Sequence, residues 1–230
     1  MSGKESLNKG GIYCFMDAVA KNAEEYGAEH TTPMSALLEE IERFTLTGMP
    51  YPSMLTGRVE GRFLQFVVQL FAPRHIVEIG TFTGYSALAM AEGLRDGGEV
   101  LTIEIDPDFA KLAQSFFDRS PSGKKIVLRV GDALEVMKTL HDGGTDLVFI
   151  DADKKSYEAY YRESMRILRP GGIILVDNVL WYGRIFDPKD DDSRAIAKFN
   201  DMVNADPHAE KLFLTIRDGI YLVRKHSAEE

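Results

Sequence analysis

Short apolar runs alternate with amphipathic segments through most of the chain. Five runs have the continuous apolar character of strands that are buried on both faces of a sheet. They are His75–Ile79, Val100–Glu104, Lys125–Val130, Asp146–Ile150 and Ile173–Asp177. The intervening segments carry apolar residues at helical spacing, over Tyr85–Leu94, Pro107–Arg119, Ala133–Leu140 and Tyr157–Leu168. This alternation predicts a mostly parallel sheet with helices on both faces.

The N-terminal part has a helical pattern only. Apolar residues recur every three or four positions over 12–20, and again over 58–71 through Val59, Phe63, Val67, Leu70 and Phe71. Thr32-Pro33 combines a cap residue with a proline in the first turn, which predicts the start of another helix there.

The C-terminal part predicts a hairpin, because Leu212–Ile216 and Ile220–Val223 flank Arg217-Asp218-Gly219. Asp106-Pro107 and Arg169-Pro170-Gly171-Gly172 mark boundaries between elements. Together, the segments predict one α/β domain with a Rossmann-like, doubly wound, mostly parallel seven-stranded sheet that ends in an antiparallel hairpin. Residues 1–53 would form a helical extension and residues 54–230 the core.

Composition narrows the function classes. The 230 residues carry a formal net charge of −9 without a basic run, which argues against nucleic acid as a partner. Cys14 is the single cysteine, so an internal disulfide and a thiolate metal cluster are both excluded. The chain has no apolar signal-peptide core and no membrane-length apolar segment. We expect a cytoplasmic protein with a small-molecule partner.

A glycine-rich segment, Glu78-Ile-Gly80-Thr-Phe-Thr-Gly84-Tyr-Ser86, joins the first strand to the next helix. Glycines allow the backbone to approach a ligand closely, and the helix N-terminus favours an anionic group. Gly80 and Gly84 lack the middle glycine of the dinucleotide-binding pattern, and no Gly-Lys-Ser/Thr follows, which excludes a P-loop.

Two further segments follow the next strands. Glu104 ends the second strand, where an acid can bind the ribose hydroxyls of an adenosyl ligand, and Gly131-Asp132-Ala133 follows the third, within reach of an adenine ring. Three such elements in order indicate an adenosyl cofactor without pyrophosphate, namely S-adenosylmethionine.

Five motifs in the same order carry a family resemblance: EIGTFTGYS, LTIEIDPD, GDA, FIDADK and LVDNVLWYG. From about Met54 to the terminal hairpin, the chain resembles the cation-dependent O-methyltransferases, which include the catechol and caffeoyl-coenzyme A enzymes. The resemblance implies a homodimer, with the N-terminal helices as interface. It is looser over those helices.

The resemblance also implies roles for individual residues. Gly80 and Ser86 would contact the methionine part of the cofactor, and Glu104 the ribose. Asp132 and Ala133 would border the adenine ring. Met54 and Thr56, at the entry to the helix predicted over 58–71, match positions that line the cofactor pocket. Glu78 would lie near the methionine ammonium group, or would cap backbone N–H groups instead.

Oxygen ligands follow the fourth and fifth strands. Asp151, Asp177 and Asn178 lie where neighbouring strands end, and Mg²⁺ accepts such ligands while it keeps positions open for two substrate hydroxyls. Mn²⁺ and Ca²⁺ are alternatives. Each residue alone would be interpreted as a turn or helix cap, but together they predict a metal site in which Asp151 also borders the cofactor and the reaction centre.

Lys154 follows Asp151 by three residues. Near a cation the ammonium form of a lysine is disfavoured, so Lys154 can act as general base toward a substrate hydroxyl. The alternative is a solvated lysine that forms an ion pair with Asp151. Asp153 and Lys155 match a solvated face. Trp181 follows the predicted metal ligands and would form a wall against a planar acceptor, or would pack in the core.

The resulting hypothesis is an S-adenosylmethionine- and cation-dependent O-methyltransferase that acts on one hydroxyl of a vicinal diol, of catechol type. Three alternatives stay open: methylation of a non-catechol small molecule, a non-catalytic cofactor-binding protein, and a nicotinamide-dependent reductase. The missing middle glycine disfavours the reductase.

Overall fold

The structure is a computed structural model that describes residues 23 and 25–227. The chain divides into two compact units, Met1–Pro33 and Met34–Glu230. Residues 25–29 of the first unit are helical. The predicted helix over 12–20 and Cys14 lie outside the described residues. The second unit contains the sheet and all the predicted site residues.

A seven-stranded sheet forms the centre of the second unit, in the order β3-β2-β1-β4-β5-β7-β6. Strands β1 to β5 pair in parallel, and β7 pairs antiparallel with both β5 and β6. The strands are β1 (His75–Ile79), β2 (Glu99–Glu104), β3 (Ile126–Val130), β4 (Thr145–Ile150), β5 (Leu168–Asp177), β6 (Ala209–Leu214) and β7 (Ile220–Lys225). The predicted fold class and the C-terminal hairpin are confirmed.

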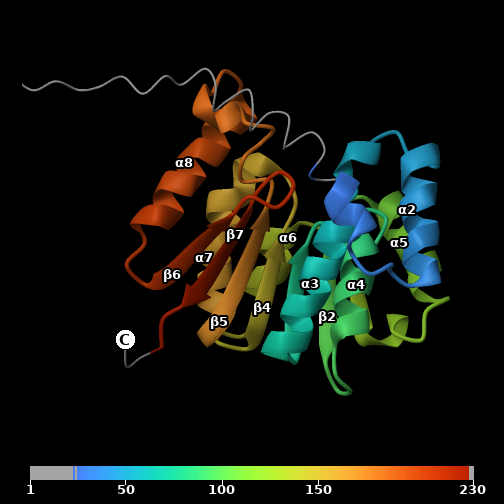
Figure 1. The fold of residues 1–230 in the computed structure, drawn as a ribbon. Coiled ribbons are helices and arrows are strands. Elements are labelled where there is room, and N and C mark those ends of the chain that lie inside the picture. Colours follow the sequence, from blue (N-terminus) through green and yellow to red (C-terminus); the bar gives the residue numbers. More distant parts are fainter. Residues whose placement is uncertain (1–22, 24, 228–230) are drawn as a thin grey trace, which may run out of the picture. The chain divides into compact units, whose positions relative to one another are not determined.

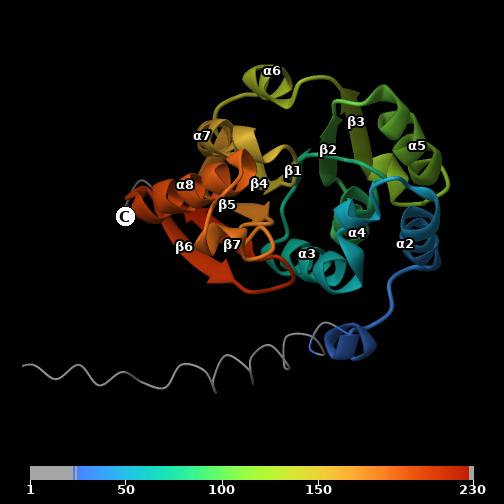
Figure 2. The ribbon, with the colours of Figure 1, turned by 90° about the horizontal axis from the view of Figure 1, so that it is seen from above.

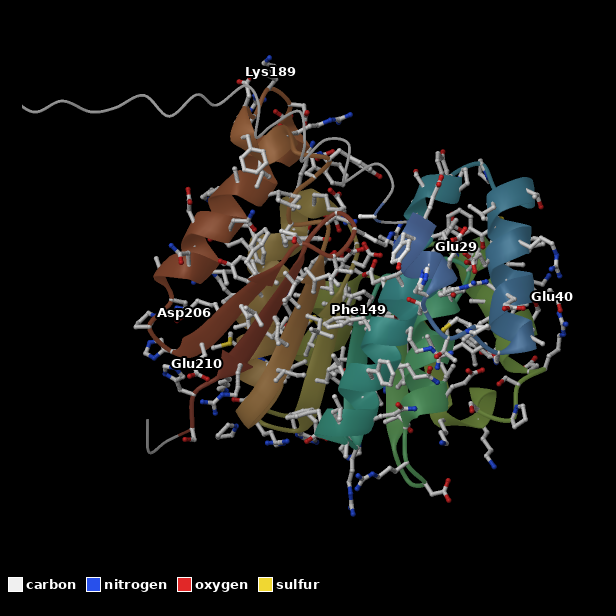
Figure 3. All side chains as sticks on the ribbon, in the orientation of Figure 1. Glu29, Glu40, Phe149, Lys189, Asp206 and Glu210 are labelled. Carbon is white, nitrogen blue, oxygen red and sulfur yellow. The ribbon has the colours of Figure 1, made fainter. Side chains whose placement is uncertain are left out.

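Helices cover both faces of the sheet (Figures 1 and 2). They are α2 (Ala36–Gly48), α3 (Gly57–Phe71), α4 (Tyr85–Gly93), α5 (Pro107–Phe117), α6 (Ala133–Lys138), α7 (Tyr157–Ile167) and α8 (Asp191–Ala205). Alternate residues of β4 face opposite sides, as strand geometry requires. Leu147 and Phe149 pack in the core with α2 to α5, and Val148 and Ile150 in the core with α6 to α8. Phe149 marks the middle of the sheet in Figure 3.

Helix α2 begins later than the Thr32-Pro33 signal predicts. Its N-cap is Ser35, whose Oγ accepts a hydrogen bond from Leu38 N at 3.3 Å and donates one to Glu92 Oε1 at 2.7 Å. The predicted start was therefore wrong by a few residues, because a serine cap with a long-range partner lies further along the chain.

The buried face of α3 also differs from the prediction. The predicted stripe through Phe63 and Leu70 is only partly buried, and Leu70 is 85% exposed. The fully buried stripe is Glu60, Leu64 and Val68. The prediction followed hydrophobicity, whereas a buried glutamate takes part in the observed packing.

Strand β5 runs through the Arg169–Gly172 segment that was predicted to be a boundary. The register between β4 and β5 shifts between Thr145 and Leu147, so the ladder accommodates the irregularity. No helix among the described residues is long and apolar enough to cross a membrane.

Candidate active site

Most of the predicted site residues lie at or just after the carboxyl ends of β1 to β5, where an open parallel sheet binds its ligands, whereas Met54 and Thr56 precede α3. Backbone hydrogen bonds extend the ladder into the loops that follow these strands. Gly80 N donates to Ile103 O and Asp151 N donates to Ile79 O, each at 3.0 Å. The glycine-rich loop and the FIDADKK segment are therefore held side by side.

Gly80 is required by this close approach. Its φ is +98°, a backbone conformation that residues other than glycine rarely adopt. A Cβ atom at residue 80 would lie 2.1 Å from the carbonyl oxygen of Asp151. Gly80, which was predicted to contact the cofactor, thus allows the loop after β1 to pack closely against the loop after β4.

Glu104 ends β2 and is buried. Its Oε2 accepts hydrogen bonds from Thr81 N at 3.1 Å and Phe82 N at 2.8 Å, and its Oε1 accepts one from Asp106 N at 3.0 Å. The carboxylate therefore holds the glycine-rich loop against the end of β2. The predicted contact with a ribose stays a prediction.

Glu78 is fully buried at the end of β1. Thr102 Oγ1 donates to its Oε2 at 2.5 Å, and the hydroxyls of Thr81 and Thr102 lie 2.5 Å apart. Burial raises the pKa of Glu78 to about 8, although the hydroxyls of Ser86 and Thr102 oppose the shift. Its Oε1 is buried and has no hydrogen-bond partner among the described residues. An ammonium group would satisfy this oxygen.

The other predicted cofactor residues lie at the start of α3 and at the start of α6. Thr56 is buried at the start of α3, and Met54 is 50% exposed in a short 3₁₀ turn just before it. Asp132 is the N-cap of α6, where its Oδ1 accepts from Glu135 N at 3.0 Å, and Ala133 is the first helical residue. The N–H of Gly131 donates to Glu104 O at 2.8 Å, which links this segment to the end of β2.

Lys154 lies at the centre of the predicted site residues that follow β4 and β5. Its Nζ donates to Asp151 Oδ1 at 3.1 Å, to Asn178 Oδ1 at 2.6 Å and to Tyr157 OH at 2.5 Å. The Lys154 side chain is only 9% exposed. The ion pair with Asp151 that the alternative to a catalytic role predicted is present, but the lysine is nearly buried and not solvated as in that alternative. The structure brings together three of the predicted catalytic and metal-binding residues.

Asp177 is the last residue of β5, directly before Asn178, and is buried. Burial and the nearby Asp151 carboxylate raise the pKa of Asp177. Its Oδ1 accepts from Asn178 N at 2.6 Å. The hydroxyl of Tyr157 donates to the Asp177 backbone carbonyl at 3.1 Å and thereby presents its lone pair to Lys154.

The donor chemistry at Asp151, Asp177 and Asn178 fits a hard divalent cation. All three offer oxygen ligands, and the Lys154 ammonium, itself a cation, bridges Asp151 and Asn178. Among the described residues, no three His, Cys, Asp or Glu side chains form a metal-binding group. The predicted set has two carboxylates and an amide.

Trp181 follows the fifth strand in a left-handed backbone conformation, with a φ of +47°. It packs against the core on the side of α6 to α8, as the core alternative predicts. Lys154 Nζ lies 5.5 Å from its ring centroid, so the same ring also borders the predicted site. The tryptophan thus has one side in the core and one side near the lysine.

Sequence reasoning missed three residues of this region: Tyr157, Glu60 and Arg217. Tyr157 follows Lys154 by three residues, and this helical spacing was an available signal. Glu60 and Arg217 are joined at 3.0 Å across 157 positions of sequence, a contact that local patterns do not reveal.

Comparisons with known proteins identify the family. The O-methyltransferase family matches residues 28–226. A caffeoyl-CoA O-methyltransferase of Petroselinum crispum is 35% identical over 77% of this chain and 79% of its own. A catechol O-methyltransferase of Niastella koreensis is 34% identical over 78% of this chain and 82% of its own. An O-methyltransferase of Bacillus cereus, solved in complex with SAH, has a TM-score of 0.80 and 29% identity, with 88% of this chain and 96% of that chain covered. The resemblance and the prediction of an enzyme are confirmed, and the chain belongs to the O-methyltransferase family.

Proposed function

We propose that this protein transfers a methyl group from S-adenosylmethionine to one hydroxyl of a vicinal diol, of catechol type, with the help of a divalent cation. The observation that carries the proposal is the Lys154 group. An amine with Asp151 and Asn178 oxygens around it lies next to the loop that holds Gly80. The segments that the proposal assigns to the cofactor and to the reacting hydroxyl are therefore adjacent.

The cofactor assignment is supported by the loop after β1. The unpartnered Oε1 of Glu78 suits the ammonium group of a methionine moiety, and Gly80 leaves the backbone close to the ligand. The Bacillus cereus relative was solved with SAH, the product of such a transfer. In this assignment Met54, Thr56, Ser86, Glu104, Asp132 and Ala133 surround the rest of the cofactor.

Asp151, Asp177 and Asn178 would hold the cation. When bound, a divalent cation stabilises an oxyanion and lowers the pKa of a coordinated hydroxyl. The pKa of Asp177 is raised by burial and by Asp151, so an added positive charge relieves repulsion between the two carboxylates. Mg²⁺ is the first candidate, with Mn²⁺ and Ca²⁺ as alternatives.

The chain itself supplies the proton acceptor and the orientation. In its neutral amine form, Lys154 would take the proton of the reacting hydroxyl, and Tyr157 fixes the direction of its Nζ atom. The resulting oxygen attacks the methyl carbon in line, the carbon–sulfur bond breaks, and S-adenosylhomocysteine leaves. No covalent protein intermediate is needed, since positioning and charge stabilisation supply the catalysis.

The acceptor class rests on the aromatic side of the site and on two relatives. Trp181 and Tyr182 follow the metal residues, with ring centroids 5.7 Å apart, and suit a flat aromatic acceptor. The Niastella and Petroselinum relatives are named for catechol and caffeoyl-CoA, which share a vicinal diol. Methylation of a non-catechol hydroxyl is the alternative.

We also propose a homodimer and a cytoplasmic location. Phe66 and Leu70 of α3 are 53% and 85% exposed, and exposed apolar side chains on one helix support a protein contact. Light scattering on the full chain tests the dimer; a monomer at micromolar concentration would contradict it.

The test of the acceptor class is transfer of labelled methyl from S-adenosylmethionine to pairs of matched aromatics. Each pair has one vicinal diol and the corresponding monohydroxy compound. We expect transfer to the diols only. Equal transfer to both members of a pair would overturn the diol assignment, and no transfer to any acceptor would favour a non-catalytic cofactor-binding protein.

A further inference from the structure

Arg217 lies in the turn between β6 and β7. Along the sequence, it is far from every residue that was assigned to the site above. It has a left-handed backbone conformation, with a φ of +46°. Its Nη1 donates to Leu55 O at 2.9 Å, to Thr56 O, and to Glu60 Oε2 at 3.0 Å. One side chain therefore holds the segment that leads into α3 and the first turn of that helix.

The acceptor on α3 explains why an arginine is suited to this position. Glu60 is fully buried, and a buried carboxylate requires a charged or hydrogen-bonding partner. Arg217 supplies the partner through Nη1, the same nitrogen that reaches the two carbonyl oxygens.

The same turn also holds the opposite side of the site. Asp218 Oδ1 accepts from Tyr182 N at 2.6 Å, and Asp218 O accepts from Leu180 N at 2.8 Å. Gly219 O accepts from Val179 N at 3.2 Å. These bonds flank Trp181. The turn over residues 217–219 thus joins the Leu55–Thr56 segment to the aromatic segment.

We propose that Arg217 is a positioning residue that fixes the cofactor-binding segment at Thr56 relative to the acceptor wall at Trp181. The inference rests on the proposed function, because that function places the cofactor and the acceptor at these segments. The hydrogen bonds of Arg217 given above go to two backbone carbonyls and to Glu60, which suits a role in positioning rather than in the reaction itself. Its hydrogen bonds to the two carbonyls would hold the pocket in its binding geometry before the cofactor arrives.

Removal of Arg217 alone would leave Glu60 buried and unpaired, so unfolding would obscure the result. The test therefore uses the double variant Arg217→Met/Glu60→Gln, which has no buried charge at this point. We expect its Tm to stay close to that of the wild type, while Kd for S-adenosylmethionine rises about tenfold because the two carbonyl contacts are lost. Glu60→Gln alone keeps those contacts and should bind the cofactor within about twofold of the wild type.

The matched control is Arg224→Met on the same hairpin, which removes an exposed ion pair of 2.8 Å to Glu210. We expect it to leave cofactor affinity unchanged. A double variant with wild-type cofactor affinity would overturn the inference, because Arg217 would then serve only to neutralise Glu60.

Amide hydrogen exchange separates this inference from the proposed function. In the absence of cofactor, we expect faster exchange over residues 55–58 in the double variant than in Glu60→Gln. Unchanged exchange there would also overturn the positioning role. A wild-type protein that fails to bind S-adenosylmethionine would refute the proposed function instead, whatever the exchange shows.

Discussion

The Nζ atom of Lys154 lies 2.6 Å from Oδ1 of Asn178, although 24 residues separate them in the sequence. One follows β4 and the other β5, and the parallel pairing of these strands brings them together. The contact places the amine beside the carboxylate of Asp151 and the amide of Asn178, the two groups that are also proposed to hold the cation.

Substitution of Lys154 by methionine should remove the proton acceptor. We expect kcat for methyl transfer to fall by about 10² to 10⁴, the usual contribution of a positioned general base. Cofactor affinity, measured by calorimetry, should change little. Lys155→Met is the matched control, because Lys155 is the next residue and its side chain is 65% exposed. A similar loss in both variants would contradict the assignment.

Asp177→Asn should weaken cation binding. Electron paramagnetic resonance of Mn²⁺ is expected to show a loss of affinity of at least about tenfold, since the carboxylate charge is lost at the site. S-adenosylmethionine should still bind with near wild-type affinity. Asp187→Asn, at an exposed loop position, should leave Mn²⁺ binding unchanged. Wild-type Mn²⁺ affinity in Asp177→Asn would remove this residue from the metal site.

The raised pKa of Glu78 predicts that the stability of the folded protein depends on pH. Its pKa is about 8 in the folded protein, against an ordinary value of 4.5. Between these pH values the folded state retains a proton that the unfolded chain releases, so the free energy of unfolding falls as pH rises. Chemical unfolding of the cofactor-free protein should show this decline from pH 5 to pH 8.

Glu78→Gln should flatten this decline and leave only the contributions of other buried acids. Equal slopes for the variant and the wild type would mean that Glu78 ionises normally. Binding of a cationic ammonium group should release a proton from Glu78 near pH 7, which calorimetry in buffers of different ionisation enthalpy would detect.

Gly80→Ala should disrupt the glycine-rich loop after β1. The added Cβ would meet the Asp151 carbonyl oxygen at 2.1 Å, in addition to the strain of a positive φ. Gly97 is the matched control, because its φ is +81° and a Cβ there meets no atom within 4 Å. We expect Gly97→Ala to cost about 1 kcal/mol of unfolding free energy, and Gly80→Ala clearly more. Equal costs would show that the close approach is unimportant.

The sequence predicted the sheet well because its strands are buried on both faces and therefore have continuous apolar runs. The positions of Asp151, Lys154 and Asn178 followed from one rule, that carboxyl ends of parallel strands meet. Their contacts could be anticipated for the same reason. Tyr157 was missed because a buried aromatic residue in a helix is usually assigned to the core.

The contacts of α3 could not be predicted in this way. Hydrophobicity selected the stripe of Phe63 and Leu70, but the buried stripe includes Glu60. A glutamate on a buried face is stable only with a partner, and the partner comes from the hairpin turn at Arg217. Such a pairing depends on tertiary structure, and local sequence patterns contain no information about it.

The most direct test of the central claim is the rate of methyl transfer from S-adenosylmethionine to a catechol-type diol as Mg²⁺ is varied. We predict that turnover saturates with Mg²⁺, stops when a chelator is added, and returns when Mg²⁺ is restored. Turnover at an undiminished rate in the presence of the chelator would contradict the cation-dependent mechanism.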